Sequence, residues 1–245
     1  MEAYQSTLSE LVAATASPGS EISVLRLPSA RVAGKGFASA QALEVPAILR
    51  SIAAAVDSGT EAVAIGNGFD PGLWEARELF DVPVLGLFET VALYSLRVGW
   101  RLGVLTSGKS GASRIEEMAA RYGISSRLVS PVAVGVTVPT VVEAFTNAEV
   151  AAQVLAATDV ALTELASRGA DVVMVASGAL DVFLHTHGMS TLTKLPVLPA
   201  VPILVRELEA VAGLARLGVT HASRTGRFAQ APQAVLESLR QPADT

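Results

Sequence analysis

The stretch Asp171-Val-Val-Met-Val-Ala-Ser177-Gly178 joins an apolar run to a small polar residue and a glycine. An earlier stretch, Glu61-Ala-Val-Ala-Ile-Gly-Asn67-Gly68, has the same order, and a helical pattern and a Pro-Val-Leu triplet follow both. Such nearly all-apolar runs are typical of strands buried on both faces of a parallel sheet. The two copies predict two similar lobes, with Asn67 and Ser177 at equivalent strand ends across a shared cleft. Any two strand–helix–strand units share part of this pattern, so the duplication is a hypothesis.

Apolar runs alternate with amphipathic stretches along the rest of the chain. The expected strands are residues 22–27, 62–65, 82–87, 102–105, 132–138, 171–176 and 196–201. The expected helices are residues 4–14, 46–56, 73–80, 90–98, 110–122, 148–168 and 202–217. This alternation predicts an α/β fold whose two similar lobes each have a mostly parallel sheet flanked by helices, with the active-site cleft between them. We expect residues 1–93 with 205–245 to form one lobe and residues 94–204 the other.

The composition argues against several classes of protein. The 245 residues contain no cysteine, which excludes disulfides, Cys-ligated metal sites and a thiolate nucleophile. A net charge of −5 argues against a nucleic-acid partner. The uncharged stretch 128–142 has 15 residues and two prolines, and a membrane span needs about 20 apolar residues. With no pattern typical of a signal peptide at the N-terminus, we expect a cytoplasmic globular protein without a membrane segment.

One segment matches the P-loop pattern of nucleotide hydrolases. It is Gly103-Val-Leu-Thr-Ser-Gly108-Lys109-Ser110. Its first glycine falls inside an apolar run, so the next residues are expected in a strand rather than in a phosphate-binding loop. No later apolar run ends in an aspartate that would hold magnesium. A P-loop hydrolase is therefore a distant alternative.

Small polar residues follow two of the expected strands. Thr106 and Ser107 lie between a strand and a helix, and hydroxyls beside the free amides of a helix N-terminus are typical of a carboxylate or phosphate site. Capping of that helix by Ser107 or Ser110 explains them equally well. Asn67 lies between two glycines, where its amide can stabilise an oxyanion or serve a turn with positive φ.

Other polar residues have simpler interpretations. Asp70 before Pro71 predicts the N-cap of the next helix. His185 and His187 lie near the end of the helix after the second copy, and residues two apart do not share a helix face for metal binding. His221 lies in a polar loop from which it can approach the cleft. We predict no metal site and no cofactor.

Several segments, in this order and spacing, resemble the aspartate/glutamate/hydantoin racemase superfamily. They are residues 68–73, 82–86, 101–107, 172–180 and 220–232. The nearest branch is the hydantoin racemases, and arylmalonate decarboxylase and maleate isomerase are relatives. The resemblance implies two α/β lobes around a cleft, with one catalytic cysteine from each lobe. Asn67 and Ser177 stand at the positions of the two cysteines, and Thr106 and Ser107 match the hydroxyl pair that binds the carboxylate or imide of the substrate.

The chain departs from the family in two respects. A serine hydroxyl is far less acidic than a thiol, whose pKa is about 8.5, and an asparagine moves no protons, so a two-base racemisation is not expected. The family also opens with a buried strand and an Asn-Pro-Asn-Thr-like turn, whereas this sequence begins with the following helix. We expect that the sequence starts late.

The resemblance and the residues together predict an enzyme that acts on a small carboxylate- or imide-bearing substrate. Its cysteine-independent chemistry would be an isomerisation, a decarboxylation or the cleavage of a C–N or C–C bond, with oxyanion stabilisation. Asn67 and Ser177 are the expected catalytic residues. The expected substrate-binding residues are Thr106, Ser107, Gly68, Gly178 and His221. The main alternative is a non-catalytic, metabolite-binding homologue, and the family habit of self-association implies a homo-oligomer.

Overall fold

The computed structural model describes residues 2–27, 37–188 and 194–241, and its strands form two parallel sheets. In the smaller sheet β1 (Val63–Ile65) pairs with β2 (Val84–Gly86). The larger sheet has the order β4-β3-β5-β6, and every pair in it is parallel. Its strands are β3 (Leu102–Thr106), β4 (Val132–Ala133), β5 (Val172–Val175) and β6 (Val197–Leu198). The predicted α/β class with parallel sheets is confirmed.

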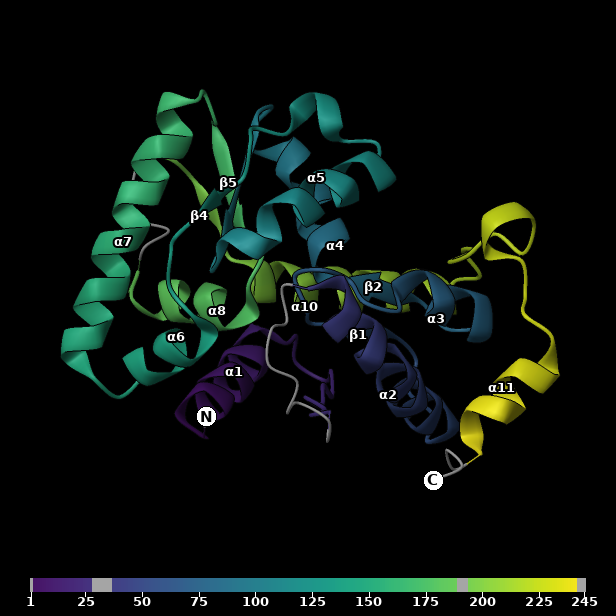
Figure 1. The fold of residues 1–245 in the computed structure, drawn as a ribbon. Coiled ribbons are helices and arrows are strands. Elements are labelled where there is room, and N and C mark those ends of the chain that lie inside the picture. The colour runs from purple at the N-terminus through teal and green to yellow at the C-terminus, as the bar shows by residue number, and fades with distance from the viewer. Residues whose placement is uncertain (1, 28–36, 189–193, 242–245) are drawn as a thin grey trace.

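Helices flank both sheets. They are α1 (Glu2–Thr15), α2 (Ala38–Asp57), α3 (Leu73–Leu79), α4 (Leu87–Tyr94), α5 (Ala112–Arg121), α6 (Val138–Ala144), α7 (Ala148–Ser167), α8 (Gly178–Thr186), α10 (Ala200–Arg216) and α11 (Gln233–Arg240). In Figure 1, α7 runs along one side of the larger sheet and α5 lies on the other side. Among the described helices, α7 alone has the length and apolar composition of a membrane span, and its buried residues pack in the core as those of a globular core helix do.

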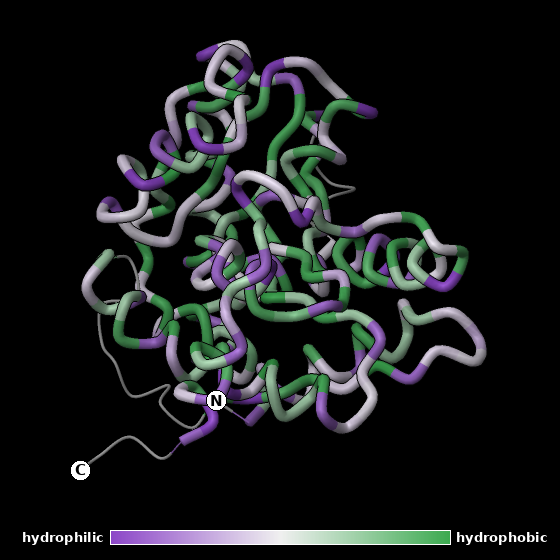
Figure 2. The backbone as a smooth tube through the Cα atoms, turned by 90° about the vertical axis from the view of Figure 1, so that its right-hand side faces the viewer, coloured by the Kyte–Doolittle hydropathy of each residue, from purple (hydrophilic) through white to green (hydrophobic). Residues whose placement is uncertain are grey.

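The core lies on both faces of the larger sheet, because successive side chains of a strand point to opposite faces. Leu105, Val173 and Val175 pack with residues of α6, α7 and α8. Val104 and Met174 pack with residues of α4, α5 and α10 on the other face. All five side chains are fully buried. Figure 2 shows that the central segments of the tube are mostly hydrophobic.

The first helix packs against the helices that follow β5 and β6. Val12 of α1 lies in a buried cluster with Val182 of α8 and with Val201 and Val205 of α10. This contact places the start of the chain beside the end of β5, where the second copy of the repeated pattern ends. The division of the chain into two lobes at residues 93 and 205 stays a prediction.

The expected strands 82–87 and 196–201 shorten to β2 and β6, because the helices after them begin at Leu87 and Ala200. Three other expected elements differ more. Residues 22–27 form no strand, because no neighbouring strand pairs with them, and Leu25 is 64% exposed. The expected strand 132–138 shortens to β4, and α6 begins at Val138 behind Thr137, whose side chain accepts a hydrogen bond from the N–H of Thr140. Helix α2 begins at Ala38 and contains Pro46, which the sequence suggested as its first residue. Neither α6 nor α11 was expected.

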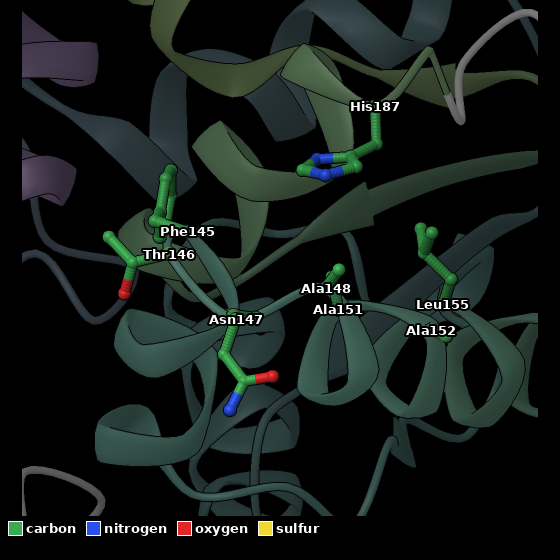
Figure 3. Close-up of a pocket in the computed structure, with 9 residues that line it drawn as sticks. Phe145, Thr146, Asn147, Ala148, Ala151, Ala152, Leu155 and His187 are labelled. Carbon is green, nitrogen blue, oxygen red and sulfur yellow. The ribbon is translucent and has the colours of Figure 1, made fainter.

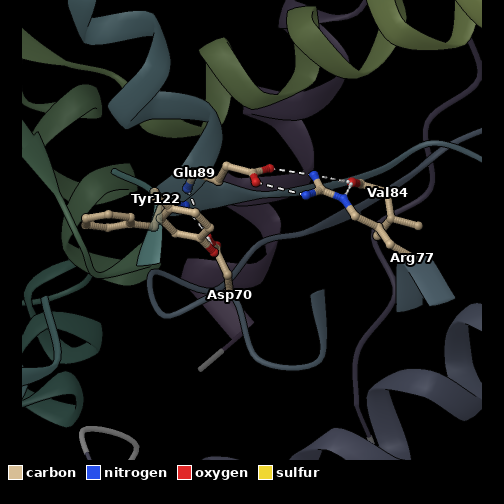
Figure 4. A network of polar contacts seen from close by, with 6 residues as sticks. Asp70, Arg77, Val84, Glu89 and Tyr122 are labelled. Carbon is tan, nitrogen blue, oxygen red and sulfur yellow. Dashed lines mark hydrogen bonds and ion pairs between the residues drawn. The ribbon is translucent and has the colours of Figure 1, made fainter. Parts of the chain in front are cut away.

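A buried carboxylate joins the loop after β1 to α4. The Asp70 carboxylate accepts hydrogen bonds from the N–H groups of Phe88 and Glu89 at the start of α4, each over 2.9 Å, and from the hydroxyl of Tyr122, also over 2.9 Å. Figure 4 shows this network beside the ion pair of Arg77 with Glu89, which joins α3 to α4. The carboxylate therefore satisfies amides that a helix N-terminus leaves unpaired.

A second buried carboxylate repeats this arrangement in the other copy. The Asp181 carboxylate accepts hydrogen bonds from the N–H groups of Ala200 (2.8 Å) and Val201 (3.1 Å) at the start of α10. Burial raises the pKa of both Asp70 and Asp181 to about 7, and the backbone hydrogen bonds oppose that shift. The prediction that Asp70 caps the next helix is wrong: α3 starts behind Gly72 without a side-chain cap, and Asp70 reaches the helix beyond the following strand.

Candidate functional site at the strand ends

The carboxyl ends of β3 and β5 bring two predicted site residues into contact. Because Leu105 pairs with Val175, the residues that follow the two strands lie side by side. The Ser107 Oγ donates a hydrogen bond to the Ser177 Oγ over 2.8 Å, and both side chains are half-buried. Ser177 is the N-cap residue of α8, yet its side chain forms no capping bond. Because the Ser177 Oγ is the acceptor in its bond with Ser107, its own proton remains available for a further hydrogen bond.

Helix capping does not account for the hydroxyls after β3. The N-cap residue of α5 is Gly111, which has no side-chain cap, so neither Ser107 nor Ser110 fills that role. Thr106 is 2% exposed, and its Oγ1 donates to the Gly108 carbonyl over 3.1 Å. Thr106 therefore holds the loop, while Ser107 presents its hydroxyl to Ser177.

The match to the P-loop pattern has a packing explanation. Gly103 lies inside β3, where an added Cβ would come within 3.0 Å of the Ala170 Cβ and 3.1 Å of a Leu165 methyl carbon. The glycine thus allows α7 to pack closely on the strand. Residues 103–106 form ladder hydrogen bonds as strand and cannot wrap a phosphate, and Lys109 is exposed.

The loop after β1 touches the loop after β5, backbone against backbone. A Cβ added to Gly68 would lie 2.5 Å from the carbonyl carbon of Ala176, and one added to Gly178 would lie 3.4 Å from the carbonyl oxygen of Gly66. Asn67, between the two glycines, is half-buried, and its Oδ1 accepts a hydrogen bond from the N–H of Phe69 over 3.0 Å. The Asn67 amide nitrogen has no hydrogen-bond partner among the described residues. The structure thus brings the ends of both sequence copies together.

A tyrosine that the sequence analysis missed lies at the same place. The hydroxyl of Tyr4 in α1 is 3.6 Å from the position of a Cβ on Gly178, the first residue of α8. Its ring packs against Phe145 with 5.7 Å between ring centroids. Burial, with the nearby Asp181 carboxylate, raises the pKa of Tyr4, so the phenol is a neutral hydrogen-bond donor at neutral pH. In the sequence, nothing distinguishes Tyr4 from an ordinary core aromatic residue.

The structure does not bring His221 to these residues. Its Nε2 lies 3.5 Å from the Asp81 Oδ1, and Asp81 precedes β2, so the histidine is at the amino end of a strand. Ser107 and Ser177 follow the carboxyl ends of their strands. No group of three or more His, Asp or Glu side chains within residues 2–27, 37–188 and 194–241 is arranged to hold a metal ion.

A pocket of about 520 Å³ lies at the other end of α8 (Figure 3). His187, just beyond the last residue of α8, faces Asn147 and Ala148 at the start of α7 across this space. The His187 ring packs on Phe183 at 4.1 Å between centroids. As predicted, the histidines lie at the end of the helix, and they take no part in the strand-end site.

The fold is that of an α/β protein with parallel sheets, and a small group of neutral hydrogen-bonding side chains lies where the strand ends converge. A model of the Asp/Glu/hydantoin racemase family matches residues 2–208, and the chain belongs to this family. The hydantoin racemase of Rhizobium meliloti is 26% identical over 180 residues, which cover 71% of this chain and 69% of that protein.

Solved structures with the same fold are also racemases. The allantoin racemase of Klebsiella pneumoniae has a TM-score of 0.80 at 22% identity, covering 94% of this chain and 89% of its own. The allantoin racemase of Pseudomonas fluorescens has a TM-score of 0.78 at 24% identity, covering 93% and 92%. The glutamate racemase RacE1 of Bacillus anthracis has a TM-score of 0.67 at 16% identity, covering 90% and 80%. These identities establish the two-lobed fold alone.

Proposed function

We propose that this protein is an isomerase that acts on a small imide- or carboxylate-bearing compound at the strand-end site, without cysteine chemistry. The observation that carries the proposal is the hydrogen-bonded pair of Ser107 and Ser177, which lies against the loop that carries Asn67. Membership of the racemase family, with relatives named for hydantoin and allantoin, supports the reaction class and the imide.

The site offers neutral donors rather than an ionised base. No ionisable side chain among the described residues bonds to either serine hydroxyl, and the chain has no cysteine. When the proton on the carbon next to a carbonyl leaves, negative charge develops on the carbonyl oxygen. The Ser177 hydroxyl and the Asn67 amide nitrogen donate hydrogen bonds to that oxygen, and the neutral Tyr4 phenol lies within reach of the same place. A bound water or a basic group of the substrate takes the proton, and return of a proton to the opposite face inverts the carbon.

Two further candidates use the same site. A decarboxylation or a C–N cleavage passes through the same enolate, so product analysis separates these reactions from isomerisation. The absence of cysteine favours the second candidate, a non-catalytic homologue that binds a metabolite. We also propose a cytoplasmic, cofactor-independent homo-oligomer, and sedimentation of the purified protein tests its assembly.

The test is exchange of the carbon-bound proton in D₂O. Proton NMR and chiral chromatography follow single enantiomers of 5-substituted hydantoins, allantoin, aspartate and glutamate. Proton NMR alone follows the α-substituted malonates, which are achiral. We expect exchange with racemisation for at least one compound, and a loss of about 10²- to 10³-fold in kcat for Ser177→Ala. Full activity of this variant contradicts the role of Ser177. Tight binding with neither exchange nor product favours the non-catalytic homologue.

A further inference from the structure

A guanidinium nitrogen beside the strand-end site is buried without a hydrogen-bond partner. Nη2 of Arg114 donates to the Gln41 Oε1 over 2.6 Å, whereas Nη1 is buried and has no partner among the described residues. Native proteins rarely leave a buried donor atom unpaired. This donor therefore requires an explanation.

Arg114 lies next to the residues that form the site. It is the third residue of α5, the helix that follows the Ser107 loop, and its guanidinium covers the ring of Phe69 at 5.0 Å from the centroid. The Phe69 ring also packs by Gly111, where an added Cβ would lie 3.2 Å from the ring and 3.3 Å from the Thr106 Cβ. Because Phe69 follows Asn67 and Gly68 directly, the guanidinium lies beside the loops after β1 and β3.

A second arginine with an unpartnered Nη1 differs in its other bonds. The Arg127 guanidinium donates to the carbonyl oxygens of Trp100 and Gly99, each over 3.0 Å, and to the Ser95 Oγ over 3.3 Å. These three bonds give Arg127 a structural role in joining chain segments. Arg114 forms one such bond, to Gln41, and no carboxylate among the described residues lies in hydrogen-bond contact with its guanidinium.

The chemistry of Arg114 selects the kind of ligand. A guanidinium stays charged in proteins, although burial lowers the pKa of Arg114, with the nearby Glu117 opposing that shift. Its planar N–H groups match the geometry of a carboxylate, and such charge-assisted bonds are stronger than neutral ones. The serines, the asparagine and Tyr4 supply neutral donors for a carbonyl or an imide.

We infer that Arg114 binds a carboxylate of the ligand in the strand-end site, so that this ligand carries an anionic group in addition to the carbonyl or imide that reacts. The inference rests on the proposed function, which supplies the site. The ligand class is then a small organic anion, such as a hydantoin with a carboxylate on its side chain, rather than a neutral ring.

The experiment compares two probes that differ in one charge. Hydantoin-5-acetate and hydantoin-5-acetamide are titrated calorimetrically into the full chain. We expect the acetate to bind about tenfold to a hundredfold more tightly than the amide. Arg114→Gln is expected to abolish this preference while leaving the affinity for the amide unchanged, and Arg114→Lys, which keeps the charge, is expected to retain part of it.

The matched control is Arg121→Gln, which removes the same charge from the same helix. Arg121 is exposed and lies over Trp74 at 4.8 Å, so its variant should keep most of the preference for the acetate. Three results would overturn the inference. They are equal affinities for the two probes in the parent protein, binding of neither probe, and a preference that survives Arg114→Gln in a variant that melts like the parent. Carboxylate preference without D₂O exchange refutes the proposed function alone, and exchange without preference refutes the inference alone.

Discussion

Replacing Gly68 by alanine tests whether contact between the loops after β1 and β5 shapes the site. An added Cβ would lie 2.5 Å from the carbonyl carbon and 2.6 Å from the carbonyl oxygen of Ala176, and an ordinary contact begins at 3.4 Å. The difference of 3.4 − 2.5 = 0.9 Å has to come from the backbone of one loop or the other. Ala176 precedes Ser177, so the shift changes the position of Ser177 relative to Ser107, whose hydroxyls are 2.8 Å apart.

A misplacement of about 1 Å can lower a rate about 10²-fold, and we expect a loss of that size in the D₂O exchange assay for Gly68→Ala. Overpacking of this kind also destabilises a fold by about 1–3 kcal/mol, which a thermal melt detects. The matched control is Gly66→Ala in the same loop, where an added Cβ meets nothing within 4 Å. The reasoning is refuted if Gly68→Ala exchanges substrate and melts as Gly66→Ala does.

Three further predictions concern the buried groups. Asp181→Ala leaves two buried N–H groups of α10 without an acceptor, at about 1–3 kcal/mol each, so its urea midpoint at pH 6 should fall well below that of Asp181→Asn; equal midpoints would contradict this. The ordinary pKa of an aspartate is 3.8, and burial raises the pKa of Asp70 and Asp181 to about 7. In the pH window between these two values, both side chains hold protons in the native state that they lose in the unfolded chain. The free energy of unfolding should therefore fall as the pH rises through this window. The Asp70→Asn/Asp181→Asn double variant should show a flatter pH profile, and an unchanged slope would refute the assignment. Tyr4→Phe should lower kcat about tenfold or more without lowering the melting temperature, whereas Tyr94→Phe should leave both unchanged.

The local composition of the chain was enough to predict the buried strands of the larger sheet. The runs that form β3 and β5 are apolar because both faces of the sheet are covered, so they could be recognised without knowledge of their partners. The carboxyl ends of such strands meet at one edge, so Ser107 lies near Ser177, a contact that the sequence analysis did not predict although it assigned both residues to the site. Residues 22–27 have a similar composition, but a strand also needs a neighbour to pair with, and pairing is not visible in composition.

The parts of the site that depend on long-range packing could not be predicted. Arg114 resembles any charged residue of an amphipathic helix, and only the packing of Phe69 against α5 places it beside the site. Tyr4 reaches Gly178 because α1 docks on α8 and α10, a contact between opposite ends of the chain. Asp70 followed a helix-capping pattern, yet its side chain caps a helix 18 residues further on.

The repeated carboxylate links have a consequence for how the chain folds. Asp70 and Phe88 are 18 residues apart, and Asp181 and Ala200 are 19 residues apart, so each link closes a short segment of its own copy. Closing short segments loses little chain entropy, and contacts that are local in sequence form early. Each strand–helix–strand–helix copy thus carries the means to become ordered before the other copy is in place. We expect hydrogen exchange to reveal two cooperative units, with the strand-end site assembled only when the units dock.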